Sequence, residues 1–369
     1  MKKIISIIGA RPQIIKSAAL TRVCMNSTEL KEVVVHTQQH YSDRLSSDLI
    51  RDLAIPEPAI KLPSPSGNSL AQIAHMILEL ERVFVSEKPD ALVVYGDTNS
   101  TIAASIVAAH LNIPLAHIES GLRSFNREMP EEINRIVTDH LSTLLFCPST
   151  TASKQLLKEG FSTGSATQAT AASPLLFECG DIMFDNALHY GQNAPKPDLE
   201  NYIFLTLHRP SNVDNPEALI SFLKGLLEIA LELNLKIMFP IHPRTLKNCE
   251  SSAAWKELSQ SEQLQLTEPL PYTETMGALK HAHLVWTDSG GLCKEAFMMG
   301  TPCLILRSET EWVELVENGY AQVVHNDLNA IKEKSEAFLN NGMPAAKNLY
   351  GDGHAAQFIH DTLVQYLNS

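Results

Sequence analysis

The sequence lacks several features that would assign the protein to a specialised class. Its six cysteines include no Cys-x-x-Cys pair, which disfavours a zinc site or a disulfide framework and favours free thiols in the reducing cytoplasm. The 14 histidines form no His-Glu-x-x-His motif or comparable spacing, so neither a metal nor another cofactor is expected. No apolar run reaches the roughly 18 residues that cross a bilayer, which predicts a soluble protein without a membrane partner.

Positive charge is also scarce. The chain carries 29 Lys and Arg residues against 42 Asp and Glu residues, which gives a formal net charge of -13 at pH 7. Nucleic acids and anionic membranes attract basic surfaces, so this acidic protein is not expected to bind either of them. An anionic small ligand would need a local group of positive side chains.

The pattern of apolar residues predicts α/β domains with parallel sheets. Short β-rich apolar runs alternate with segments whose apolar residues recur at helical spacing, which is typical of doubly wound sheets. In the first half of the chain, the expected strands are residues 4–8, 33–36, 91–95, 115–118 and 144–147, and the expected helices are residues 12–24, 68–85, 100–110, 131–141 and 152–158. A second series of apolar runs begins at Tyr202, Lys236, His283, Pro302 and Ala321.

Two Rossmann-like domains are therefore expected, at residues 1–190 and 200–350, because 369 residues exceed what one hydrophobic core usually serves. The boundary is expected near residues 191–199, where glycine and proline concentrate as in a linker. The last helix, at residues 354–369, could pack back on the first domain. Residues 161–173 are small and polar, which predicts an exposed loop.

Three carboxylates of the first domain are the candidate chemical groups: Asp97, Glu119 and Glu131. Asp97 and Glu119 directly follow two expected strands, and loops at the carboxyl ends of parallel strands line the ligand crevice. Such acids can transfer protons or stabilise positive charge on a sugar ring as a glycosyl bond breaks. Acids in a first helical turn also complement the helix dipole, and for Glu132 this simpler interpretation is preferred.

The end of the first expected strand offers a phosphate site. Gly9 permits close approach of the backbone, and Pro12 suits the first turn of a helix, whose N-terminus attracts anions. Arg11 and Lys16 would add positive charge there. A surface arginine and lysine without a ligand explain the same motif equally well.

A second phosphate site is expected where a strand of the second domain leads into a helix. Ser289, Gly290 and Gly291 offer a hydroxyl and backbone N–H groups at that helix start. Glu295 lies one turn further, where a carboxylate can accept both hydroxyls of a ribose. A Gly-rich turn that serves only packing is the alternative.

His208 and Arg209 end another strand of the second domain and would face a bound pyrophosphate. His242 ends the next strand in a similar way, but a packing role is preferred for it. Together with the two phosphate sites, these residues suggest a nucleoside diphosphate held between the domains.

The ordered motifs of the chain resemble those of the UDP-N-acetylglucosamine 2-epimerase family. These motifs span nearly the whole chain, which makes chance resemblance improbable. They are GARP at Gly9, TQQH at Thr37, GDTNST at Gly96, HIESGLR at His117, PEEINR at Pro130, GD at Gly180, HR at His208, HPR at His242 and DSGG at Asp288, with Glu295 beyond it.

The resemblance implies the GT-B arrangement, in which two Rossmann-like domains face a cleft as in glycogen phosphorylase. It implies a homodimeric enzyme that eliminates UDP from a UDP-sugar and re-adds it with inverted configuration at the second sugar carbon. By resemblance, Asp97, Glu119 and Glu131 are acid/base or charge-stabilising groups, and His208 faces the leaving pyrophosphate. The implied nucleotide contacts are Arg11, Lys16, Arg209, Ser289, Gly290, Gly291 and Glu295.

Departures from the family pattern indicate a branch. The first loop reads GARPQ where many members have GTRPE, Ser211 replaces a usual glutamate, and Trp312 replaces an arginine that a tryptophan cannot match in charge. These variants resemble the branch that acts on UDP-2,3-diacetamido-2,3-dideoxyglucuronic acid, a precursor of surface polysaccharide.

Family members that need UDP-N-acetylglucosamine as an activator bind it through a Gln-His-x-Gln run. This chain has Gln-His-Tyr-Ser at residues 39–42, so hyperbolic turnover without an activator is expected.

Three other functions fit the same motifs. A glycosyltransferase would also bind UDP, but it would need an acceptor. A hydrolysing 2-epimerase would release UDP and free N-acetylmannosamine. A non-catalytic UDP-sugar sensor would have no need for three acids and His208.

Overall fold

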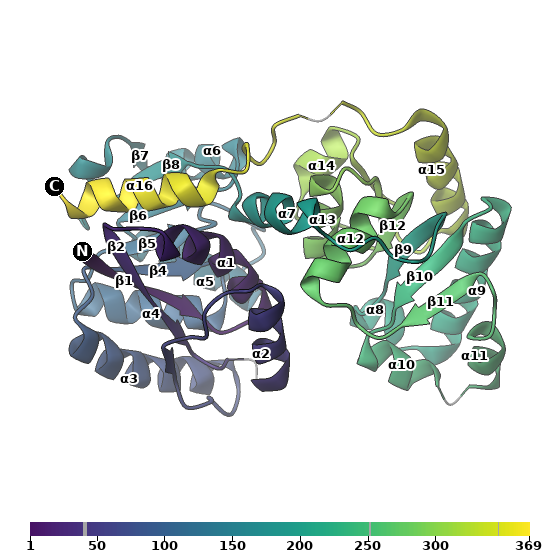
Figure 1. Cartoon of the computed structure of the whole chain (residues 1–369), viewed down its shortest axis with the longest axis horizontal. Helices are drawn as coiled ribbons and strands as arrows, with labels where there is room; N and C mark the ends of the chain where they lie inside the picture. The colour runs from purple at the N-terminus through teal and green to yellow at the C-terminus, as the bar shows by residue number, and fades with distance from the viewer. Residues whose placement is uncertain (40–42, 251, 346) are drawn as a thin grey trace. The chain divides into compact units, whose positions relative to one another are not determined.

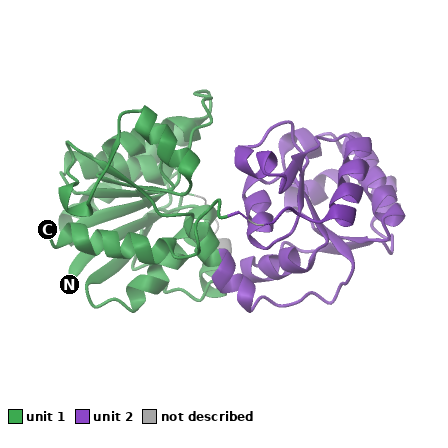
Figure 2. Ribbon diagram, turned by 90° about the horizontal axis from the view of Figure 1, so that it is seen from above, with its two compact units in different colours: residues 1–186, 348–369 green, residues 187–347 purple. Residues whose placement is uncertain are grey.

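The computed structural model describes residues 1–39, 43–250, 252–345 and 347–369. Two compact units contain these residues: unit 1 comprises residues 1–186 and 348–369, and unit 2 comprises residues 187–347 (Figure 2). Each unit contains a parallel sheet flanked by helices (Figure 1). The predicted fold class, α/β with two doubly wound sheets, is confirmed. Among the described residues, no helix has the length and apolar character to cross a membrane.

The sheet of unit 1 has eight strands, and all of its neighbouring strands run parallel. In spatial order the strands are β3 (Ile60–Lys61), β2 (Leu30–His36), β1 (Lys2–Ile8), β4 (Ala91–Tyr95), β5 (Leu115–Ile118), β6 (Leu144–Cys147), β8 (Leu175–Glu178) and β7 (Ser162–Thr163). The helices are α1 (Arg11–Met25), α2 (Asp43–Asp52), α3 (Ser69–Glu87), α4 (Asn99–His110), α5 (Pro130–Leu141), α6 (Thr150–Lys158), the 3₁₀ helix η1 (Ala166–Gln168), α7 (Ile182–Gln192) and α16 (Ala355–Leu367).

Alternate residues of the central strands direct side chains to opposite faces of the unit 1 sheet. Ile5 and Ile7 of β1 join a buried cluster with Met76, Leu80 and Phe84 of α3. In Figure 1, α3 and α4 lie on one side of this sheet and α16 lies on the other. Helices on both faces explain why the central strands are apolar along their whole length rather than on alternate residues.

The sheet of unit 2 has six strands, and these are also parallel to their neighbours. In spatial order they are β11 (Leu264–Thr267), β10 (Lys236–Pro240), β9 (Tyr202–Thr206), β12 (Leu284–Thr287), β13 (Cys303–Ile305) and β14 (Ala321–Val323). The helices are α8 (Pro210–Val213), α9 (Pro216–Glu232), α10 (Pro243–Cys249), α11 (Ala253–Leu258), α12 (Tyr272–His281), α13 (Gly290–Met298), α14 (Val313–Glu317) and α15 (Leu328–Asn341).

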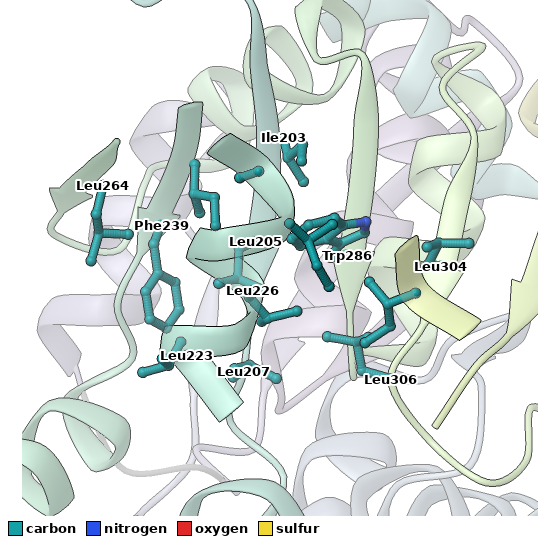
Figure 3. Close-up of a cluster of buried hydrophobic side chains, with 14 of the residues drawn as sticks. Ile203, Leu205, Leu207, Leu223, Leu226, Phe239, Leu264, Trp286, Leu304 and Leu306 are labelled. Carbon is teal, nitrogen blue, oxygen red and sulfur yellow. The ribbon is translucent and has the colours of Figure 1, made fainter. Parts of the chain in front are cut away.

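The core of unit 2 gathers around the indole of Trp286 on β12 (Figure 3). Leucine and isoleucine side chains from β9, β13 and α9 surround it, among them Leu205, Leu226 and Leu304. The indole N–H of the fully buried Trp286 donates to Ser335 Oγ on α15 at 3.2 Å, so the one polar group of this side chain is satisfied.

The strand order reverses at the centre of each sheet, between β1 and β4 in unit 1 and between β9 and β12 in unit 2. In doubly wound sheets, ligands bind outside the carboxyl ends of the strands at this switch point. Four turns therefore define where a site is expected: those after β1 and β4, and those after β9 and β12.

One segment differs from its sequence-based expectation. Residues 161–173, expected to form an exposed loop, contain β7 and η1, and η1 packs against α16. The Gly- and Pro-rich segment after α7 lies against α12, because a Cβ added to Gly277 would be 2.1 Å from the carbonyl oxygen of Pro195. Lys280 of α12 also donates to the carbonyl oxygen of Gly191, near the end of α7, at 2.7 Å, so α12 contacts both this helix end and the segment that follows it.

The last helix, α16, packs against α1 of unit 1. The carboxylate of Asp185 on α7 accepts the backbone N–H groups of Ala355 and Ala356 at 3.2 and 2.8 Å, which caps the N-terminus of α16. Gly180 has a φ of +83°, and a Cβ there would lie 2.9 Å from the Cα of Gly351, so the close approach of these two segments requires glycine.

Candidate functional site

The turn after β1 packs directly on the turn after β4. A Cβ added to Gly9 would lie 2.1 Å from Thr37 Oγ1 and 2.2 Å from Ser100 Oγ, so glycine is required there. The carboxamide of the buried Gln13 accepts from the backbone N–H of Ala10 at 3.2 Å and donates to the carbonyl oxygen of Tyr95 at 3.0 Å. A glutamate carboxylate could not donate to that carbonyl, which gives the GARPQ variant a physical reason.

Basic side chains hold two carboxylates at the ends of β4 and β5. Asp97 contacts Arg135 of α5, whose Nε donates to Asp97 Oδ2 at 3.1 Å and whose Nη2 reaches the same oxygen. Glu119 makes an ion pair with Lys16 of α1. Burial alone would lower the pKa of Arg135, but Asp97, Glu132 and Glu119 raise it above its ordinary value. Two of the predicted acids thus lie in one charged cluster.

Lys16 connects the two turns of this cluster. A Cβ added to Gly96, the residue before Asp97, would lie 3.2 Å from Lys16 Nζ. Lys16 therefore lies beside the Asp97 turn and also neutralises Glu119, whereas the sequence interpretation placed it with Arg11 at the start of α1. Arg11 is exposed at the first position of that helix.

The backbone of Glu119 is strained. Its φ of +73° is in the left-handed region, which costs a non-glycine residue about 1–3 kcal/mol. The backbone N–H groups of Glu119 and Ser120 both donate to the carbonyl oxygen of Phe146 at 3.1 Å, which holds the turn. A carboxylate in an over-determined, strained turn is typical of a functional residue.

The two acids at the start of α5 differ in their surroundings. Glu131 is exposed, and within the described part of the chain no hydrogen bond or ion pair joins it to Asp97. Glu132 is 1% exposed and accepts from the backbone N–H groups of Ser124 and Phe125 at 2.8 and 2.9 Å. The interpretation of Glu132 as a mere complement to the helix dipole is therefore wrong, because its carboxylate organises the preceding loop.

A buried carboxylate organises the turn after β9 in unit 2. Asp288 accepts from the backbone N–H groups of His208 and Arg209, each at 2.9 Å, and from Asn212 Nδ2 at 3.0 Å. His208 Nδ1 lies 2.9 Å from Asp288 Oδ1. Burial would raise the pKa of the Asp288 carboxyl, but the hydrogen bonds and charge of His208 and the backbone N–H groups hold it below its ordinary value. His208 and Arg209 are thus brought to the start of α13.

His242 caps a helix beside this cluster. Its Nδ1 accepts the backbone N–H of Arg244 at 3.2 Å, which satisfies a donor at the start of α10. Its ring lies 6.0 Å from that of His208, centroid to centroid. Burial, and then the charges of His208 and Arg244, lower its pKa. The local structure of His242 is therefore that of a helix cap.

The start of α13 is covered by a loop of the same unit. Ser289 is its N-cap residue and accepts from Leu292 N at 3.4 Å, while Glu295 is 8% exposed one turn later. The indole N–H of Trp312 donates to the carbonyl oxygen of Gly290 at 2.9 Å. Lys294 Nζ lies 4.2 Å from the centroid of that indole, at cation–π distance.

Residues 22–364 match the family model described as UDP-N-acetylglucosamine 2-epimerase. The chain belongs to this family. The resemblance drawn from its motifs is confirmed. The motifs that begin at Gly9, Gly96, His208 and Asp288 follow β1, β4, β9 and β12, the strands of the two switch points.

Relatives of known function or known structure match this chain over nearly its whole length. A Pseudomonas aeruginosa protein, UDP-2,3-diacetamido-2,3-dideoxy-D-glucuronate 2-epimerase, is 39% identical over 98% of this chain and 99% of its own. The crystal structure of Methanocaldococcus jannaschii UDP-GlcNAc 2-epimerase in complex with UDP-GlcNAc and UDP gives a TM-score of 0.82 at 36% identity, covering 98% of this chain and 99% of that one. The S. aureus MnaA–UDP structure gives 0.84 at 29% identity, covering 100% and 97%.

Three residues that the structure places at the site were not singled out from the sequence. Arg135 and Asp288 lie inside recognised motifs, but only the fold shows that one pairs with Asp97 and the other holds His208. His117 is the third, because its buried ring lies within hydrogen-bond distance of the carbonyl oxygen of Gly96, the residue before Asp97.

The proposed activator run at residues 39–42 lies outside the described residues except for Gln39. The carboxamide oxygen of Gln39 accepts from the backbone N–H of Ser100 at 2.9 Å and from its hydroxyl at 2.7 Å. This residue thus fixes the start of α4. The expectation of hyperbolic turnover without an activator stays a prediction.

Proposed function

We propose that this protein is a non-hydrolysing UDP-sugar 2-epimerase that inverts the second carbon of a UDP-2-acetamido sugar. One observation carries the proposal: two carboxylates at adjacent strand ends, Asp97 and Glu119, are each paired with a cation in a family whose relatives are 2-epimerases. Carboxylates at this position can act as acid/base groups toward a bound sugar.

The reaction follows from the weak acidity of the second sugar carbon. No carbonyl activates its C–H bond, so the departure of UDP from the first carbon must accompany proton removal. A carboxylate takes the proton, the C1–O bond breaks, and UDP leaves with the bonding electron pair, which gives a 1,2-unsaturated sugar. Re-addition of UDP to C1 with protonation of C2 from the opposite face gives the epimer. Asp97, Glu119 and Glu131 are the proposed acid/base groups.

The residues of unit 2 are proposed to hold UDP. The N-terminus of α13, with Ser289, Gly290 and Gly291, offers backbone N–H groups to a phosphate. His208 Nδ1 is paired with the Asp288 carboxylate, so Nε2 is the ring nitrogen that would contact the pyrophosphate. Arg209 and Glu295 are further proposed nucleotide contacts of unit 2. In unit 1, the proposed nucleotide contacts are Arg11 and Lys16.

A second candidate substrate is UDP-2,3-diacetamido-2,3-dideoxyglucuronic acid. The 39% identical P. aeruginosa relative bears that name, and Trp312 stands where many family members have arginine. Comparison of kcat/KM for this sugar and for UDP-N-acetylglucosamine separates the two candidates, and a tenfold preference for either one identifies the substrate class.

Replacement of Glu119 tests the proposed chemistry. Glu119→Gln keeps the shape of the side chain but removes its capacity as a base, so turnover is expected to fall by about 10²–10⁴-fold while UDP affinity is retained. Glu81→Gln, on the exposed face of α3, is the matched control and should turn over normally. Substantial residual epimerisation by Glu119→Gln would remove this residue from the mechanism.

We also propose a cytoplasmic homodimer. The six cysteines of the chain are all free, which suits a reducing compartment. Light scattering during size-exclusion chromatography tests the oligomeric state, and a mass near 40.7 kDa would contradict the dimer.

A further inference from the structure

A buried charged network lies beneath the turns that carry Asp97 and Glu119. His117 is in β5, and its side chain is fully buried. Its ring Nε2 lies 2.8 Å from the carbonyl oxygen of Gly96, and its Nδ1 lies 2.7 Å from Asp139 Oδ1 on α5. One imidazole therefore connects the turn after β4 with α5.

The hydrogen-bond partners of His117 fix its protons. A carbonyl oxygen can only accept, so Nε2 must carry a proton toward Gly96. The other oxygen of Asp139 accepts from Gly121 N at 3.2 Å and from Arg123 Nη1 at 2.6 Å, so this carboxylate is ionised beside a guanidinium. An ionised Asp139 requires a donor at His117 Nδ1 as well. Both ring nitrogens then carry protons, and the ring is an imidazolium.

We propose that His117 is a positioning residue, held as an imidazolium, that fixes the backbone turns carrying Asp97 and Glu119. Gly96, whose carbonyl it holds, directly precedes Asp97 and has a φ of +60°. Through Asp139 it also holds Gly121, two residues after the strained Glu119. If His117 is replaced, the turns after β4 and β5 lose hydrogen bonds that hold their backbone conformations, and Asp97 and Glu119 can shift from their positions.

The protonation of His117 is tested directly on the wild-type protein. Two-dimensional ¹H–¹⁵N spectra of protein labelled with [¹⁵N]histidine are recorded at neutral pH, and His117→Gln identifies the signals that belong to His117. Both ring nitrogens are expected to be protonated. A spectrum in which either nitrogen lacks a proton overturns the imidazolium. This test does not depend on any enzymatic activity.

Two matched variants test positioning, and this part rests on the proposed function. His117→Gln can place an amide donor near the original Nε2 and keep the bond to Gly96, whereas His117→Asn can place one near Nδ1 and keep the bond to Asp139. Misplacement of a reacting group by about 1 Å costs on the order of 100-fold in rate. We therefore expect kcat to fall by about 100-fold in His117→Asn and by less in His117→Gln, with KM within about twofold of the wild type.

Hydrogen exchange by mass spectrometry separates positioning from folding. Peptides that cover β4 and β5 should keep wild-type protection in both variants. A normal kcat in His117→Asn, or a loss of kcat that accompanies lost protection across these strands, would overturn the positioning role. If the wild-type protein shows no epimerase activity at all, the proposed function fails while the protonation result stands.

Discussion

Replacing Asp288 with asparagine tests how unit 2 holds His208. The fully buried carboxylate accepts from the ring of His208, from two backbone N–H groups and from the amide of Asn212. Asparagine has nearly the same shape but only one oxygen. If that oxygen keeps the backbone donors, the new NH₂ group faces His208 Nδ1, which must then be unprotonated. His208 changes its tautomer and loses its counter-charge.

The magnitude follows from the bonds that change. One hydrogen bond to a charged group is lost and the others remain, so the free energy of unfolding of unit 2 should fall by about 1–3 kcal/mol at pH 7. If His208 stabilises the leaving pyrophosphate, turnover should fall by about 100-fold or more, because an imidazole without its carboxylate carries positive charge poorly.

The pH dependence has a defined sign. Although burial raises it, the pKa of the Asp288 carboxyl is lowered on balance by His208 and the backbone N–H groups. A carboxyl whose pKa is depressed in the folded state contributes stability above its unfolded pKa, about 3.9, and loses it as pH falls through the folded value. The stability difference between wild type and Asp288→Asn should therefore narrow as pH falls below about 4, where the carboxyl of the wild type takes up a proton.

Tryptophan fluorescence during urea denaturation measures the stability difference between wild type and Asp288→Asn, and it reports on unit 2. All three tryptophans, Trp255, Trp286 and Trp312, belong to unit 2. Asp214→Asn is the control, because Asp214 forms a half-exposed ion pair with Arg244 and should cost less than about 1 kcal/mol. Equal effects of the two substitutions, or a stability difference between wild type and Asp288→Asn that persists unchanged to pH 3, would contradict this role of the Asp288 carboxylate.

Three further predictions concern side chains around the two switch points. Gly290→Ala should cost less than about 1 kcal/mol, because the Glu311 carboxylate 1.9 Å from its Cβ is the half-exposed end of a flexible side chain that can move away. Gly291→Ala has nothing within 4 Å of its Cβ, so a loss above about 1 kcal/mol in either variant, measured by urea denaturation, would contradict this. Trp312→Phe leaves the carbonyl of Gly290 without its indole donor and should cost about 1–3 kcal/mol in the same assay; an unchanged midpoint would contradict this. Arg135→Lys loses the forked contact with Asp97, so kcat should fall at least about tenfold at constant UDP affinity in calorimetry, while the exposed Arg82→Lys should be silent.

The buried strands could be predicted because they are continuous apolar runs. The expected strands at residues 91–95, 115–118 and 144–147 coincide with β4, β5 and β6. β3 and β7 were missed because two residues carry no periodic signal. β11 was missed because its LQLT sequence at the sheet edge mixes apolar and polar residues.

The candidate site could be predicted in position but not in its contacts. Strand ends placed Asp97, Glu119 and His208 at sheet edges without any structure. The partners of these residues come from distant segments, as when Lys16 of α1 pairs with Glu119, and no local pattern encodes that pairing. For the same reason the sequence could not distinguish the buried, loop-organising Glu132 from the exposed Glu131.

The activity that we propose for this protein is inversion of the second carbon of a UDP-sugar by elimination and re-addition of UDP. Proton NMR of the purified enzyme in deuterium oxide, with UDP-N-acetylglucosamine and UDP-2,3-diacetamido-2,3-dideoxyglucuronic acid supplied separately and without an acceptor, tests it most directly. We expect deuterium to enter the second sugar carbon of one substrate while UDP is still attached to the product. Release of free sugar and UDP, or no exchange with either sugar, would contradict it.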